Sequence, residues 1–222
     1  MKQSLFYFSV LLSCTVCACH NGVGEQPSAE PKLLAAFQTM AATDTMHFEL
    51  PNVEAEAAQP HSDTIPNALF FTSLDTAWLH AIDNVADSTT SVVFAKGRFP
   101  LTDQYDACLV DIHQFWFLHQ SLLLYDKQHR AFTDLLTVAE WYGGDGGQVL
   151  TGSWLFDYDG DGKKDLVHRE TEHWLHMQDD GEPRDSFAES ASLLLWKDGR
   201  FVASPNVDKA ALVKRFPIQS AW

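Results

Sequence analysis

Residues 148–175, "QVLTGSWLFDYDGDGKKDLVHRETEHWL", contain two β-rich segments separated by an acidic loop. The flanks, residues 148–156 and 166–175, are rich in valine, threonine, leucine and aromatic residues, as β-strands are. The nine residues between them carry four aspartates and two glycines, which is turn chemistry. Two strands joined by such a loop predict a hairpin, so this stretch favours a β fold over a pair of helices.

The same short-strand pattern continues on both sides of this stretch. Residues 91–99, 107–117, 121–142 and 192–202 are further β-rich runs. Residues 125–132 and 196–201 have the composition of hairpin turns, and the second contains an Asp-Gly pair that accepts positive φ. The sequence "GGDGG" at residues 143–147 lacks the lysine and hydroxyl residue of a phosphate-binding loop and joins two strands. We therefore interpret it as a hairpin connection.

Helices are expected only at the two ends of this β region. Thr72 or Ser73 is a candidate N-cap for a helix with apolar residues at positions 74, 78, 82 and 85. A last helix is expected from Pro205, with Ser204 as its cap. The predicted fold class is mainly β: an antiparallel meander of hairpins with an N-terminal and a C-terminal flanking helix.

The acidic loop has the ligand order of a calcium loop. With residue 157 as position one, oxygen ligands fall at positions one, three, five, seven and nine, and a glycine falls at six. Position twelve is His168 where an EF-hand has glutamate, and the flanks predict strands, so a helix-loop-helix sensor is excluded. The predicted calcium ligands are Asp157, Asp159, Asp161, the carbonyl of Lys163, and Asp165.

This loop resembles the D-x-D-G-D-G-x-x-D loop of FG-GAP or VCBS-type repeats, in which an aliphatic residue, here Leu166, follows the last aspartate. The resemblance implies calcium bridging two strands, and it covers about a dozen residues in a single copy. The alternative is an acidic turn without metal. Carboxylates ~4–5 Å apart repel by a few kcal/mol per pair at an effective dielectric of about 20. This cost favours calcium as the cofactor.

The amino terminus predicts export and a lipid anchor. Lys2 precedes the apolar run "LFYFSVLLS", which is too short to span a bilayer and is typical of a signal peptide. Val16-Cys17-Ala18-Cys19 then resembles the lipobox of bacterial lipoproteins, which implies acylation of Cys19. Leu11-Leu12-Ser13-Cys14 fits the same pattern but would leave an unusually short signal. We predict a signal peptide over residues 1–18, a flexible tether over 19–65 and a β-rich calcium-loop domain over 66–222.

The charge of the chain limits its partners. The formal net charge is −15, so nucleic acid and anionic membrane surfaces are unfavourable partners, and membrane contact is expected only through the lipid anchor. Once Cys19 is acylated, Cys108 is the one cysteine left in the mature chain, which excludes an intrachain disulfide. Its apolar neighbours indicate a buried side chain.

The histidines raise the question of an enzyme. His168, His173 and His176 lie near two glutamates, but on a strand His173 and His176 point to opposite faces. The motifs of zinc proteases and of serine hydrolases are absent. We therefore predict no catalytic residues. The tryptophans are expected in the core, and an exposed aromatic face would change that interpretation.

The sequence thus predicts a non-catalytic, lipid-anchored protein of the bacterial cell envelope whose calcium-stabilised β-domain binds another macromolecule, either an envelope protein or a glycan. Two alternatives stay open. One is a periplasmic inhibitor or immunity protein of a wall hydrolase, because strong negative charge suits a basic partner. The other is a hydrolase that uses the His168 and His173 strand.

Overall fold

The computed structural model describes residues 30–50, 64–81, 89–114, 117–144, 146–178 and 181–219. The predicted signal peptide and acylated Cys19 lie outside these residues. So do residues 19–29 and 51–63 of the predicted tether.

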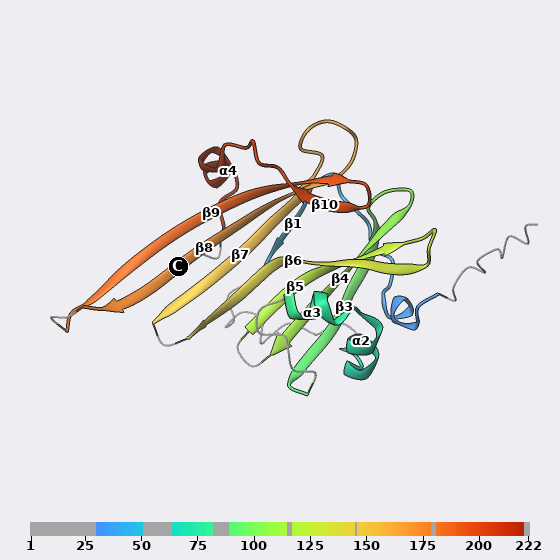
Figure 1. The fold of residues 1–222 in the computed structure, drawn as a ribbon, viewed down its shortest axis with the longest axis horizontal. Helices are drawn as coiled ribbons and strands as arrows, with labels where there is room; N and C mark the ends of the chain where they lie inside the picture. Colours follow the sequence, from blue (N-terminus) through green and yellow to red (C-terminus); the bar gives the residue numbers. More distant parts are fainter. Residues whose placement is uncertain are drawn as a thin grey trace, which may run out of the picture.

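A ten-stranded antiparallel sheet forms the body of the molecule (Figure 1). Along the chain each strand from β2 to β10 pairs with the next, and β1 pairs with β7. The predicted mainly β meander is therefore confirmed. The strands are β1 Met46–Glu49, β2 Thr64–Ile65, β3 Ser91–Pro100, β4 Tyr105–Gln114, β5 Phe117–Asp126, β6 Ala131–Gly144, β7 Gly147–Phe156, β8 Asp165–Met177, β9 Pro183–Lys197 and β10 Arg200–Ala203.

Short helical segments flank the sheet in the described part of the chain. They are the 3-10 helix η1 Lys32–Ala36 and the helices α2 Asn67–Ser73, α3 Thr76–Ala81 and α4 Lys209–Arg215. In place of one helix beginning at Thr72 or Ser73, α2 ends at Ser73 because Leu74 is extended, with φ −115° and ψ 155°. The last helix begins four residues later than expected, since the side chain of Asp208 accepts the N–H of Ala211 as its cap.

The predicted turns are present. Asp198 and Gly199 connect β9 to β10 with φ values of 50° and 83°, as a two-residue hairpin with positive φ at both positions requires. The glycine-rich segment at residues 143–147 joins β6 to β7, as predicted. At the β5–β6 turn, Asp126 accepts the N–H groups of Gln128 and His129.

Strand β6 is shared between two neighbours. Its first part pairs with β5 up to Trp141, and its last residues, from Glu140 to Gly144, pair with β7. The opposite end of β7, from Gly152 to Leu155, pairs instead with β1. Backbone donors and acceptors in a buried sheet need partners. Strand β1 supplies them where β6 leaves β7.

Residues 30–50 therefore belong to the folded domain, and the prediction of a tether over residues 19–65 is wrong for this part. Leu33, Phe37 and Phe48 are buried in the core. The N–H of Met40 donates to the carbonyl of Arg98 at 2.8 Å, which joins this segment to β3. The large apolar residues of the segment are interspersed with alanine, threonine and charged residues, and they find partners far away in the sequence.

Three groups of buried apolar residues pack on the sheet. One group includes residues of η1, α2 and α3, among them Leu33 and Phe70. A second group brings Met46 and Phe48 of β1 together with Leu155 and Leu166 on either side of the acidic loop. The third includes Leu212 and Phe216, which cover β8 and β9 at the C-terminal helix. The acidic loop thus adjoins a packed part of the sheet.

Replacing Phe48 with alanine tests whether β1 is integral to the fold. The side chain is 3% exposed, so its removal should lower the free energy of unfolding by about 3–5 kcal/mol. Urea unfolding followed by tryptophan fluorescence measures this. Thr45→Ala, at an exposed neighbouring position, serves as the control and should change little. Equal stability of Phe48→Ala and wild type would show that the segment is a tether after all.

Candidate metal centre

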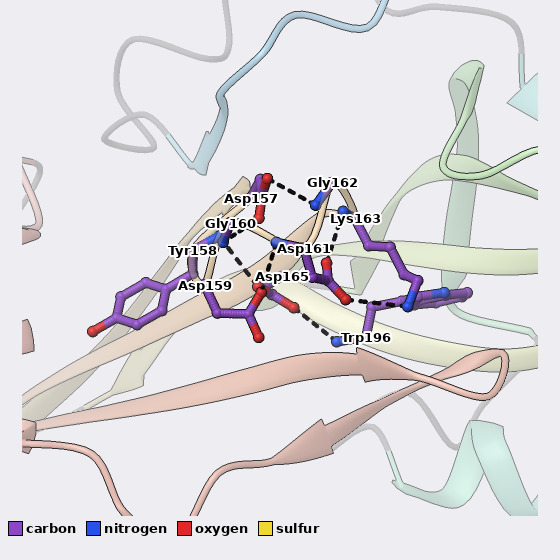
Figure 2. Close-up of polar contacts among 9 residues, drawn as sticks. All are labelled: Asp157, Tyr158, Asp159, Gly160, Asp161, Gly162, Lys163, Asp165 and Trp196. Atoms are coloured by element: carbon purple, nitrogen blue, oxygen red, sulfur yellow. Dashed lines mark hydrogen bonds and ion pairs between the residues drawn. The ribbon is translucent and has the colours of Figure 1, made fainter.

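The acidic loop is the connection between β7 and β8. The two strands pair up to Phe156 and Asp165, and the eight residues between them form a largely exposed loop. Gly160 and Gly162 have φ values of 81° and 83°, a conformation that side chains with a Cβ rarely adopt. The two glycines therefore permit the tight turns of the loop, which Figure 2 shows.

Asp157 organises the loop backbone. Its Oδ1 accepts the N–H of Gly160 at 2.8 Å, and its Oδ2 accepts the N–H of Gly162 at 3.0 Å. Asp159 accepts the N–H of Asp161 at 3.2 Å. Each of these bonds brings a partially positive N–H group to a carboxylate and offsets part of the repulsion between the acids. Figure 2 shows these contacts.

Asp165 connects the loop to a third strand. It is 2% exposed, and its two oxygens accept the N–H groups of Tyr158 at 3.1 Å and of Trp196 at 2.9 Å. Trp196 belongs to β9, so this carboxylate ties the loop to β9 as well as to β8. Burial raises the pKa of Asp165 although both N–H groups lower it. A nearby cation would favour its charged form.

Three of the predicted ligands meet at one point. One oxygen from each of Asp157, Asp159 and Asp165 lies within 4.8 Å of the others. Two oxygens that bind one calcium ion at 2.3–2.6 Å are at most about 5 Å apart, so this spacing fits a shared cation. In the described part of the chain, no other group of three or more acidic, histidine or cysteine side chains has such an arrangement.

Asp161 lies outside this group of three. Its carboxylate accepts the backbone N–H of Lys163 at 2.8 Å and pairs with the Lys163 ammonium at 3.1 Å. These hydrogen bonds, first the backbone N–H and then the side chain, lower the pKa of Asp161. The side chain that the spacing places at position five is thus directed to its own loop neighbour.

Sequence reasoning missed Lys164, which fixes the loop to the N-terminal segment. Its ammonium donates to the carbonyls of Thr43 and Asp44 at 2.8 and 2.7 Å, immediately before β1. These partners are about 120 residues away in the chain, so no local sequence pattern predicts the contact. The loop consequently joins β1, β7, β8 and β9.

The histidines of β8 do not form one site. His168 is largely buried, which lowers its pKa to about 4, and its Nδ1 lies 3.1 Å from the hydroxyl of Ser153. His173 contacts Asp185 at 2.6 Å, whereas His176 contacts Ser186 at 2.8 Å. Residues an odd number of positions apart on a strand point to opposite faces. His173 and His176 are three positions apart, so the sheet separates them, as predicted.

Cys108 is buried as predicted. The side chain has no exposed surface and forms no disulfide. Burial raises the pKa of its thiol to about 12, with the nearby Arg98 opposing and Asp106 adding to the effect. A thiol with so high a pKa stays protonated at neutral pH and behaves as a small apolar side chain.

Comparison with known proteins found no protein-family model, no curated protein and no solved structure that matches the sequence. Of the helices in the described residues, none has the length and apolar composition needed to cross a bilayer.

Two single substitutions separate the structural role of Asp165 from that of Asp161. Asp165→Ala leaves the buried N–H of Trp196 without its acceptor and should cost about 3 kcal/mol of stability even in EGTA. Asp161→Ala removes only exposed contacts and should cost less than about 0.5 kcal/mol under the same conditions. Urea unfolding in EGTA measures both. Equal costs for the two variants would contradict the bridging role of Asp165.

Proposed function

We propose that the protein is a non-catalytic, lipid-anchored envelope protein whose β-domain is stabilised by calcium and binds another macromolecule. The observation that carries the proposal is the convergence of Asp157, Asp159 and Asp165 at the junction of several strands. A cation held there would stabilise the pairing of these strands. Another surface of the β-domain would bind the partner.

Calcium is the cation that suits the loop best. The group consists of carboxylate oxygens at the β7–β8 connection, and calcium accepts six to eight oxygens at variable distances. Each of the three carboxylates accepts at least one backbone N–H group. A carboxylate has about four lone-pair sites, so the remaining ones are available to a metal. Asp161 and the Lys163 carbonyl remain proposed ligands, and Asp161 would have to exchange its contact with the Lys163 ammonium for the metal.

The anchor keeps the domain close to the membrane. If Cys19 carries the lipid, ten residues lie between it and Glu30, the first described residue. A chain of that length spans at most about 40 Å when fully extended. The proposed partner is therefore a membrane-proximal molecule of the envelope.

The environment of His168 supports binding over hydrolysis. A general base needs access to substrate and a pKa near the working pH. His168 is neutral at pH 7 with a pKa of about 4, and the Ser153 beside it has no exposed surface. This pair suits a buried hydrogen bond in the sheet better than the chemistry of the alternative hydrolase.

Calcium removal tests the metal proposal. Calcium at ~100 times its dissociation constant should stabilise the folded protein by about 2.7 kcal/mol, because the unfolded chain lacks the site. Differential scanning calorimetry with calcium and with EGTA measures the shift in Tm. Asp157→Ala should abolish the shift, while Asp103→Asn, at an exposed acidic position on another loop, should preserve it. A Tm that is the same in calcium and in EGTA would rule out the site.

Substitution of the proposed lipidation site tests the anchor. Wild-type protein should partition into the detergent phase, because acyl chains contribute about 0.8 kcal/mol per buried methylene. Cys19→Ser should move the protein to the aqueous phase, whereas Cys14→Ser should leave it in the detergent phase. Detergent phase separation with immunoblotting reports the distribution. Membrane retention of Cys19→Ser with loss in Cys14→Ser would place the anchor at Cys14, and retention of both variants would contradict the lipoprotein proposal.

A further inference from the structure

The exposed apolar side chains of the protein gather on one hairpin. Among the described residues, five large apolar side chains are exposed, and four of them lie on β8 and β9. The fifth, Val92, belongs to β3. Scattered exposed apolar residues are ordinary, but a concentration of aromatic, Met and Leu side chains is typical of a binding surface. The four are Trp174, Leu175, Met177 and Phe187.

The β8–β9 hairpin extends past the rest of the sheet. Pairing of β7 with β8 begins at Gly147 and Trp174, whereas β8 and β9 continue to pair as far as Met177 and Pro183 (Figure 1). The residues of β9 from Pro183 to Ser190 are exposed. The end of the hairpin therefore has room for a partner on both faces.

The base of the hairpin is held in place. Arg169 is buried and donates to the carbonyls of Ser190 and Val213 at 2.9 and 2.6 Å, and also to that of Phe216. These bonds link β8, β9 and the segment around α4. A hairpin fixed at its base presents its end in a defined direction, which lowers the entropic cost of binding.

Three of the apolar side chains share one face. Phe187 pairs with His173, and their rings stack with centroids 4.4 Å apart. Leu175 lies two residues further along β8 on the same face, and Met177 follows after two more. Phe187 is 63% and Met177 68% exposed. This face, defined by Leu175, Met177 and Phe187, is called the apolar tip.

The opposite face of the hairpin carries Trp174. A Cβ at Gly147 would lie 2.0 Å from Cε3 of the indole, so the ring packs directly over this glycine. The indole N–H donates to Glu172 at 2.9 Å, which fixes the ring. Trp174 is 37% exposed and offers a second aromatic contact beside the apolar tip.

The charge around the tip is strongly negative. Residues 169–190 contain seven acidic and two basic residues, which gives a net charge of −5. One of the two basic residues is the buried Arg169, which pairs with Glu189 at 3.3 Å. Apolar side chains within an acidic surround are complementary to an apolar patch within a basic surround.

From this complementarity we propose that the apolar tip docks onto a basic protein, an assignment that rests on the proposed binding function. Two copies of the chain would bring two acidic hairpins together, and nucleic acid and anionic lipid carry the wrong charge. A glycan is held largely by hydrogen bonds, whereas the three side chains that define the tip, Leu175, Met177 and Phe187, are apolar. The apolar and acidic composition therefore fits a basic protein best.

Photo-crosslinking in cells that naturally contain the protein tests this proposal. The full-length protein carries benzoylphenylalanine at position 187, at position 177 or, as the matched control, at exposed position 92. We expect protein adducts from positions 177 and 187 and none from position 92. Mass spectrometry should identify the adduct as a protein with an excess of lysine and arginine. Adducts formed with a second copy of this chain, with a lipid or with a glycan would overturn the proposal.

Purified components give the quantitative test. Phe187→Ser combined with Met177→Ser should weaken binding to the crosslinked protein at least tenfold, and Val92→Ser should leave it unchanged. All three side chains are exposed, so the Tm of each variant should equal that of wild type. Raising NaCl from 50 to 500 mM should also weaken binding, because the acidic surround is then screened. Unchanged affinity of the double variant would contradict the docking surface.

A lysine-reactive crosslinker used on the same cells separates two kinds of failure. A partner that this reagent captures, but that forms no adduct at positions 177 and 187, would contradict the apolar tip and preserve the proposed binding function. If neither reagent yields a macromolecular partner, the proposed function itself is contradicted.

Discussion

The arrangement of the whole domain depends on how the backbone of β7 finds its hydrogen-bonding partners. One edge of β7 pairs with β8 along its full length. The other edge is shared, because β6 pairs with β7 only from Gly147 to Thr151 and β1 pairs with it from Gly152 to Leu155. Buried N–H and C=O groups without partners are costly. The chain before the meander therefore has to supply a strand, and with it residues 30–50 enter the core.

The acidic loop lies where this shared strand ends, and its contacts extend well beyond the hairpin that it closes. Asp165 accepts the N–H of Trp196 from β9, and Lys164 donates to the carbonyls of Thr43 and Asp44 before β1. A cation among the three carboxylates would neutralise their repulsion and hold these strands together. The proposed metal thereby acts far from the apolar tip, as a structural cation and not as part of a binding surface.

Local patterns predicted much of this fold, since strand runs, the Asp-Gly turn and the glycine-rich connection are short-range features. The tether over residues 30–50 was predicted wrongly because Leu33 and Phe48 stand among alanine, threonine and glutamate, and their partners are distant in sequence. Aspartate spacing identified the three carboxylates that meet, but spacing alone could not show that Asp161 pairs with Lys163. The prediction that the tryptophans lie in the core is wrong for Trp174. This residue is partly exposed because β7 begins beside it, and no local pattern predicts where a neighbouring strand begins.

Hydrogen–deuterium exchange of the protein with calcium and with EGTA tests most directly the claim that the loop secures this junction. With calcium, we expect slower exchange in the loop, at the amide of Trp196 and throughout β1, because all three are linked through the loop carboxylates and Lys164. The end of the β8–β9 hairpin should exchange at the same rate in both conditions. Equal exchange in the loop and in β1 with and without calcium would contradict the account.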